Sequence, residues 1–177
     1  MPLILPELWA LDHAAAFLYP NLAGSADARV LALAGSDGAD ALLARFPHAH
    51  LADAAAGQYA GAVWFKPSGD WTPRLPELRR TLAPRAPLAI VTPGRLAPRG
   101  QPNPALLMRQ VRRIGFRIEH VLGFGSPATL AAAAAVRGAR AAGRLDLADR
   151  GEAAYRLSVR PKSGPRLSLC TLVLARA

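Results

Sequence analysis

Residues 29–38 read Arg-Val-Leu-Ala-Leu-Ala-Gly-Ser-Asp-Gly, a short apolar run followed by a turn of small residues. An apolar run of this length, bounded by turn signals, predicts a buried strand over its first five residues. Leu42, Leu43 and Phe46 then follow at helical spacing, and Pro47 ends the pattern because its nitrogen carries no hydrogen. The stretch therefore predicts a strand, a tight turn and a helix in direct succession.

The same alternation continues along the chain. Further strands are predicted at 48–53, 61–65, 88–91 and 116–122. Helices are predicted between them, one on Leu75, Leu78 and Leu82, and another on Leu106, Leu107, Val111 and Ile114. Strands that alternate with helices require crossover connections, which favour a parallel sheet covered by helices on both faces.

One helix has well-marked ends. Asn103 is a helix-capping residue, Pro104 suits the first helical position, and Gly115 follows the basic pair Arg112 and Arg113. These signals predict that the helix begins just after Asn103 and runs directly into the strand at 116–122.

The C-terminal third is predicted as a helix followed by a hairpin. An alanine-rich stretch from Thr129 to about Arg144 favours a helix, and 154–159 and 167–175 are interpreted as two antiparallel strands joined by the Pro/Gly-rich turn 160–165. The predicted fold is α/β, a Rossmann-like three-layer sandwich with a mostly parallel sheet and an antiparallel C-terminal strand.

Length and composition favour one globular domain. The chain has 177 residues, of which 51% are hydrophobic and 19% charged, which suits a single domain over 1–177 with 1–27 as an N-terminal helical lead-in. The N-terminal residues show no basic region ahead of an apolar segment, and no window approaches about 18 uninterrupted apolar residues. We therefore expect a cytoplasmic protein without membrane contact. Cys170, the one cysteine, is expected to be buried in a strand.

Charge is divided unevenly along the chain. Residues 1–73 carry a formal charge of −4 and residues 74–177 carry +14. A basic half of this kind attracts RNA or an acidic protein partner at long range. Arginine outnumbers lysine twenty to two and alanine is abundant, a bias that GC-rich coding also produces without selection for binding. Both interpretations stay open.

The order of elements resembles that of class I S-adenosylmethionine-dependent methyltransferases. The likeness covers roughly 28–177 and is best at 78–91, 111–121 and 169–176, which are similar to the family's fifth, sixth and seventh strands with the helices before the first two. It implies a methyl transferase with S-adenosylmethionine as cofactor. It identifies no catalytic residue and no methyl acceptor.

The resemblance also implies a cofactor site on the strand and turn at 29–38. In the family, the cofactor lies against a glycine-rich turn after the first strand, and an acid at the end of the second strand binds the ribose hydroxyls. The matching positions here are Ala34, Gly35, Ser36, Gly38 and Asp53.

Three departures weaken this match. Ala32 stands where the family has an acid, Ala34 and Ser36 stand at two glycine positions, and about eight residues separate Asp53 from Gly61, where the family has a further helix and strand. Gly38 fits the pattern. An ordinary strand-to-helix turn explains the stretch equally well.

A second candidate site follows the strand at 61–65. Open α/β sheets bind ligands beyond the strand ends, which makes Lys66, Ser68, Asp70 and Trp71 candidates for substrate binding. A routine turn bounded by core aromatic residues is the simpler alternative. The four histidines have no carboxylate or cysteine at metal-ligand spacing, so no metal site is predicted.

Two functions remain in competition. The first is a methyltransferase whose acceptor, a small molecule or an RNA, is not readable. The second is a catalytically inactive relative of that fold that acts as a binding or assembly subunit on RNA or an acidic partner. The alanine-rich helix near 131–142 either packs on its own domain or forms the contact of a homodimer or another protein partner.

Overall fold

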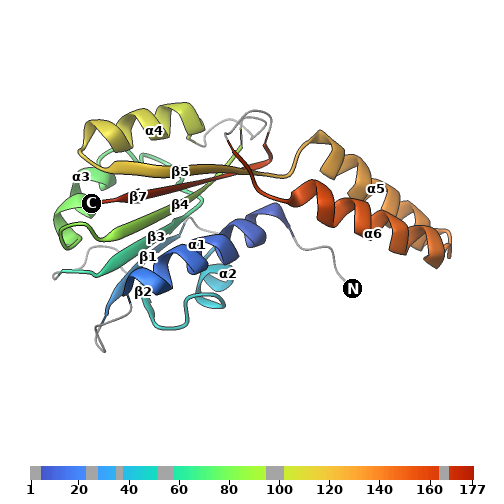
Figure 1. The fold of residues 1–177 in the computed structure, drawn as a ribbon, viewed down its shortest axis with the longest axis horizontal. Coiled ribbons are helices and arrows are strands. Elements are labelled where there is room, and N and C mark those ends of the chain that lie inside the picture. The colour runs from blue at the N-terminus through green and yellow to red at the C-terminus, as the bar shows by residue number, and fades with distance from the viewer. Residues whose placement is uncertain (1–4, 23–27, 35–37, 52–57, 95–101, 164–167) are drawn as a thin grey trace.

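The computed structural model describes residues 5–22, 28–34, 38–51, 58–94, 102–163 and 168–177. The elements in chain order are α1 (Pro6–Leu22), β1 (Val30–Ala34), α2 (Ala39–Leu43), β2 (Ala49–Leu51), β3 (Gly61–Phe65), α3 (Arg74–Thr81), β4 (Pro87–Pro93), α4 (Pro104–Arg113), β5 (Arg117–Phe124), α5 (Pro127–Ala141), α6 (Leu145–Val159), β6 (Lys162–Ser163) and β7 (Cys170–Arg176). Figure 1 shows their arrangement.

The strands form one mixed sheet in the order β2-β1-β3-β4-β7-β5-β6. β2, β1, β3 and β4 run parallel, whereas β7 is antiparallel to both of its neighbours, β4 and β5. The predicted fold class is therefore confirmed, including the antiparallel strand at the C-terminus.

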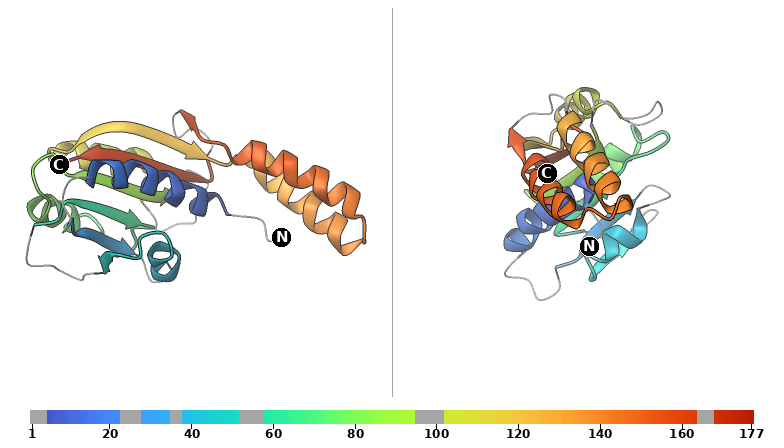
Figure 2. Two further views of the ribbon diagram at one scale, coloured as in Figure 1. Left: turned by 60° about the horizontal axis from the view of Figure 1, so that its bottom comes forward. Right: turned by 90° about the vertical axis from the view of Figure 1, so that its right-hand side faces the viewer.

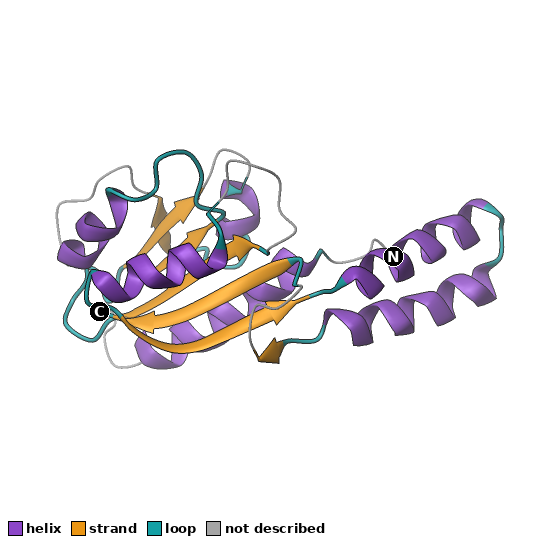
Figure 3. Ribbon diagram, turned by 90° about the horizontal axis from the view of Figure 1, so that it is seen from above, coloured by secondary structure: helices purple, strands orange, loops and turns teal. Residues whose placement is uncertain are grey.

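Helices cover both faces of the sheet (Figures 2 and 3). Successive side chains of a strand point to opposite faces, and β3 serves both. Val63 and Phe65 pack in the core beneath α1 and α2, whereas Ala62 and Trp64 pack in the core beneath α3 and α4. The run Gly-Ala-Val-Trp-Phe is buried at every position, which explains why its sequence is continuously apolar.

The signals at the start of α4 act as predicted. The Asn103 side-chain oxygen accepts a hydrogen bond from the Ala105 N–H at 2.9 Å, and Pro104 occupies the first helical position. Gly115, with φ +95°, ends the helix in a conformation that favours glycine. Among the described residues, no helix is both long enough and apolar enough to span a bilayer.

The predicted C-terminal hairpin is wrong in its first strand. Residues 154–159 form the end of α6, not a strand. Tyr155, Leu157 and Val159 alternate as a strand would, but Tyr155 and Val159, one helical turn apart, are buried, whereas Leu157 is 58% exposed. The burial period is thus that of a helix. β7 instead pairs with β4 and β5, and β6 is a two-residue strand beside β5.

α5 and α6 form a helical arm. The two helices pack against each other, and the views in Figures 1 and 2 agree that they project beyond the end of the sheet. At the base of the arm, Ala133, Tyr155 and Val159 form a small core, and Trp9 of α1 packs both there and in the core beneath α1. The alanine-rich helix therefore packs mainly on α6 rather than across the sheet.

Candidate functional site

The strand order reverses beside β1. The chain leaves β1 for β2 on one side and returns to β3 on the other. In open α/β sheets, such a switch point leaves a crevice beyond the carboxyl ends of the strands, and ligands bind there. Ala34 and Phe65, the last residues of β1 and β3, are register partners. We call the place where these two strands end the switch-point edge.

The turn after β1 carries the predicted cofactor residues. Ala34 is half-buried at the strand end and Gly38 is buried at the start of α2, whereas Gly35 and Ser36 lie outside the described residues. A Cβ on Gly38 would lie 2.4 Å from Cδ1 of Phe65. Gly38 therefore allows α2 to begin directly against β3, which is a packing requirement whether or not a ligand binds.

The structure describes one of the two positions at which the family has an acid. Ala32 is 1% exposed in the core beneath α1 and α2, so no carboxylate stands where the resemblance would place one. Asp53 lies outside the described residues. The strand before it, β2, ends at Leu51, which pairs with Ala32 of β1. The chain therefore leaves β2 on the side of β1 away from β3.

Lys66 is the described residue whose backbone is most unusual at this edge. It directly follows β3, its φ is +50°, and its N–H donates to the Val91 carbonyl at 2.8 Å. A positive φ is uncommon for a residue other than glycine and costs about 1–3 kcal/mol. Such strain is often found at ligand sites.

The Lys66 side chain is held between two groups. Its Nζ lies 3.6 Å from Glu7 Oε1, in the first turn of α1. The same nitrogen lies 5.3 Å from the centre of the Phe65 ring. The side chain is 32% exposed, so a positive charge remains accessible at the switch-point edge.

The other three predicted substrate residues do not converge on Lys66. Ser68 and Asp70 are exposed in the loop. Trp71 is 7% exposed and packs with Leu75 and its neighbours in the core beneath α3 and α4. Lys66 therefore lies on the α1 side of the sheet, whereas Trp71 lies on the side covered by α3 and α4.

Sequence reasoning missed two ionisable residues near this edge, Glu7 and Tyr155, whereas the expectation that Cys170 is buried in a strand is confirmed. Burial raises the pKa of the Cys170 thiol well above its usual value; Glu7 raises it further and Lys66 opposes the rise. Burial also raises the pKa of the Tyr155 hydroxyl, again with Glu7 adding to the rise and with Arg137 opposing it. Both groups are therefore neutral at pH 7.

The signal for Glu7 in the sequence is weak. An acid in the first turn is common because it complements the helix dipole, and nothing in its neighbourhood indicates a partner 59 positions away. Tyr155 was assigned to a strand, which hid its place at the base of the arm.

The edge offers binding groups rather than a catalytic triad. Its described residues include the accessible cation of Lys66, the carboxylate of Glu7 that pairs with it, and buried neutral thiol and phenol groups. Within the described residues, no group of three or more His, Cys, Asp or Glu side chains is placed to hold a metal ion.

Comparison with known proteins gives a likeness of structure. No protein-family model and no curated protein sequence matches the chain. Among solved structures, it is similar to an S-adenosylmethionine-dependent methyltransferase from Thermotoga maritima, with a TM-score of 0.56, 12% identity, and coverage of 96% of this chain and 88% of that one.

Two further structures match over most of both chains. One is a proposed sarcosine dimethylglycine methyltransferase from Galdieria sulphuraria, with a TM-score of 0.54, 12% identity, and coverage of 96% and 84%. The other is the [4+2]-cyclase SpnF, with a TM-score of 0.50, 11% identity, and coverage of 93% and 80%. Identities this low show the fold alone. The chain therefore has the fold of the class I S-adenosylmethionine-dependent methyltransferases.

Proposed function

We propose that the protein binds S-adenosylmethionine at the switch-point edge and acts as a methyltransferase whose acceptor is unknown. The residues proposed to hold the cofactor are Ala34, Gly35, Ser36, Gly38 and Asp53. The observation that carries the proposal is that the strand–turn–helix of β1 and α2 stands at the switch point of a methyltransferase fold.

The chain's own residues suit positioning better than acid–base chemistry. Methyl transfer depends mainly on in-line placement and on exclusion of water, so the lack of an evident base among the described residues does not oppose the proposal. Asp53 would accept hydrogen bonds from the ribose hydroxyls. Lys66, with Ser68 and Asp70 in the following loop, would contact the acceptor, and Trp71 would support that loop from the core.

The test is isothermal titration of the full chain with S-adenosylmethionine and with S-adenosylhomocysteine. We expect saturable heat with a Kd between about 1 µM and 1 mM, the usual range for enzyme ligands. Asp53→Ala should weaken both ligands at least about tenfold, because hydrogen bonds to a charged group contribute about 1.5–3 kcal/mol.

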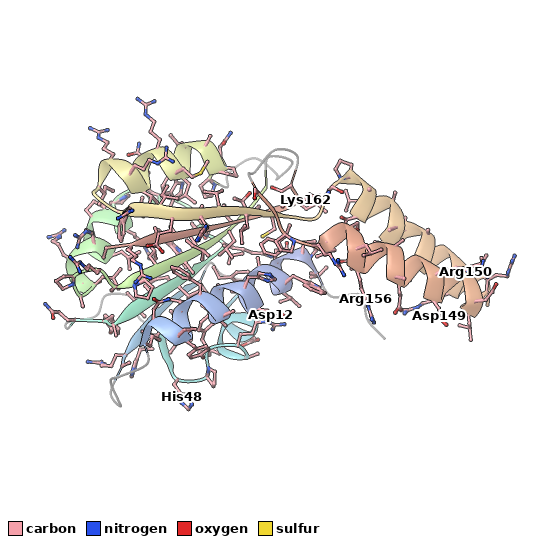
Figure 4. All side chains as sticks on the ribbon, viewed as in Figure 1. Asp12, His48, Asp149, Arg150, Arg156 and Lys162 are labelled. Carbon is pink, nitrogen blue, oxygen red and sulfur yellow. The ribbon has the colours of Figure 1, made fainter. Side chains whose placement is uncertain are left out.

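Asp149→Ala is the matched control. Asp149 lies on α6 near the far end of the arm (Figure 4), so its loss changes net charge equally without touching the switch-point edge. Absence of heat and of any thermal shift at millimolar ligand would remove the enzyme proposal.

The second candidate is a catalytically inactive relative of this fold that acts as a binding or assembly subunit. It is favoured by the buried Ala32 in place of an acid, and a fold alone does not determine function. A protein that folds cooperatively but gives no heat with either ligand would support the inactive binding or assembly subunit.

A further inference from the structure

Six arginines gather at the edge of the sheet opposite the switch-point edge. α3 and α4 run antiparallel to the strands they follow, so their last turns come where β4 and β5 begin (Figure 1). Two arginines lie at the end of each helix, one in the turn before β4 and one at the first position of β5. They are Arg79, Arg80, Arg85, Arg112, Arg113 and Arg117, and we call them the arginine edge.

Two contacts bring these elements to one place. The Arg79 guanidinium lies 5.8 Å from the centre of the Phe116 ring, which joins the end of α3 to the residue before Arg117. The Arg85 N–H donates to the Ala177 carbonyl at 3.0 Å, directly after β7. Because β7 lies between β4 and β5, the turn at Arg85 and the start of β5 border the same edge.

The charges of the arginine edge are not neutralised. None of the six forms an ion pair with a described residue, and all except the half-buried Arg79 are exposed. Among the described residues of 72–118, the one acid is Glu77, in the first turn of α3. The next acid, Glu119, accepts a hydrogen bond from Arg176 at 2.8 Å.

Five other basic residues of the described chain form ion pairs, and one of them, Arg176, lies at this same edge as the register partner of Arg117. Ion pairs join Lys66 to Glu7, Arg45 to Asp12, Arg140 and Arg156 to Glu152, and Arg176 to Glu119. Exposed arginines without an ion pair among the described residues also lie on the arm, such as Arg144 and Arg150, so the arginine edge is distinguished by the gathering of six at one edge of the sheet.

Helix stabilisation accounts for part of this pattern. Cations in the last turn of a helix complement its dipole, which explains the pairs on α3 and α4. It does not explain Arg85 in a turn or Arg117 in a strand. Arg85 has φ +63°, a conformation in which glycine is unstrained and arginine costs about 1–2 kcal/mol.

The chemistry of the surface favours a phosphate backbone over a protein. Protein interfaces centre on buried apolar or aromatic anchors. Large apolar side chains exposed by the described residues lie elsewhere, such as Leu106 in the first turn of α4 and Leu130 and Leu157 on the arm. Guanidinium groups donate two parallel hydrogen bonds to phosphate, and nucleic-acid interfaces are polar and strongly basic.

We infer that the arginine edge binds the phosphodiester backbone of a nucleic acid. The seven residues of β4 separate this edge from the switch-point edge by about 20 Å. The inference therefore goes beyond the proposed cofactor site, and failure of either one leaves the other standing.

The test measures fluorescence anisotropy of a labelled 20-nucleotide single-stranded RNA of mixed sequence, and of the same sequence as DNA, between 50 and 200 mM salt. Each phosphate contact on a single strand contributes about 0.7 to the slope of log K against log salt. Arg80→Gln with Arg113→Gln should reduce that slope by about 1.4 and weaken binding roughly tenfold at 50 mM salt.

Arg144→Gln with Arg150→Gln is the matched control, because it removes the same charge from two exposed residues of the arm: Arg144 directly precedes α6, and Arg150 lies near the far end of the arm (Figure 4). It should leave the slope unchanged. RNA and DNA bound alike indicate backbone binding, and a preference for RNA adds a contact to its 2′-hydroxyl groups. Absence of binding at 50 mM salt, equal losses in the two double variants, or displacement of RNA by poly-glutamate at equal charge would each overturn the inference.

Discussion

At the scale of single residues, Gly38 couples the turn after β1 to the sheet. Its missing side chain leaves room for the Phe65 ring, which is 2% exposed and belongs to the core beneath α1 and α2. The third glycine of a nucleotide-binding turn has the same role, close packing of helix on strand. A single glycine thus meets a packing need here while its neighbours Ala34 and Ser36 depart from the family pattern.

Gly38→Ala should destabilise the fold by about 1–3 kcal/mol, because the new methyl group would overlap a ring with little room to move. The measurement is urea unfolding followed by circular dichroism. Phe65→Leu should also lower the free energy of unfolding. The double variant should lose less free energy of unfolding than the two single variants together, since leucine leaves room for the new methyl group. Strict additivity would show that the ring and the glycine do not interact.

The pairing of Lys66 with Glu7 shows where residue-level prediction stops. The position of Lys66 after a central strand indicated the loop correctly, because parallel strands end at a common edge. Its partner depends on how α1 lies across the sheet, which local sequence does not encode, and its residue type does not indicate a positive φ. Arg85 is comparable, since neither its residue type nor its neighbours indicate a left-handed backbone.

At the scale of elements, strands that are buried on both sides were the easiest to predict. The runs at 29–33, 61–65 and 88–91 match β1, β3 and β4 because parallel strands between two helix layers must be continuously apolar. The prediction failed at 154–159, where alternation in the sequence coincided with helical spacing. When a helix packs one side against another helix, every third or fourth residue is buried. A short stretch of sequence does not distinguish this helical period from the two-residue period of a strand.

The contact between α5 and α6 can be tested with two glycines. A Cβ on Gly151 would lie 2.7 Å from Cγ2 of Val136, whereas a Cβ on Gly138 would meet nothing within 4 Å. Val136 is fully buried and its β-branched side chain is stiff in a helix. Gly138→Ala should therefore stabilise the arm by about 0.5–1 kcal/mol through helix propensity, and Gly151→Ala should destabilise it by about 1–3 kcal/mol.

Amide hydrogen exchange of the arm residues measures both effects, with the amides of β3 and β4 as an internal reference. Protection of the arm should rise in the first variant and fall in the second, while the strand amides stay unchanged. Equal protection in both variants would mean that the two helices do not pack as closely as the Gly151 contact requires.

At the scale of the whole molecule, the sheet separates two surfaces that the sequence presents as one basic half. The strand order places the ends of α3 and α4 at one edge and the turn after β1 at the other. The formal charge of residues 74–177 was readable from the sequence, but the arginine edge exists because β4 and β5 run in the same direction, so that the ends of α3 and α4 come to the same edge of the sheet. The proposed cofactor and nucleic-acid sites are consequences of that order.

The prediction of one domain over 1–177 can be tested by asking whether the rest of the chain folds without the arm. Phe124 and Cys170 are partners in the β5–β7 register, and the Leu169 N–H donates to the Phe124 carbonyl at 3.1 Å. An Asn-Gly turn can therefore join Gly125 directly to Leu169 as a hairpin. Such a variant lacks the arm and β6 but keeps the other six strands and both helix layers.

We expect the armless chain to unfold cooperatively in thermal circular dichroism and to keep its affinity for S-adenosylmethionine. The main loss of stability is the packing of Trp9 against the arm, about 1–3 kcal/mol. Part of this loss is offset, because the buried Trp9 Nε1 has no hydrogen-bond partner among the described residues and would reach water in the armless chain. Trp9→Ala in the full chain removes the same contact together with packing beneath α1, so it should destabilise more than deletion of the arm. An armless chain without a cooperative transition would instead make the arm part of the folding unit, because the sheet would then depend on contacts beyond those of Trp9.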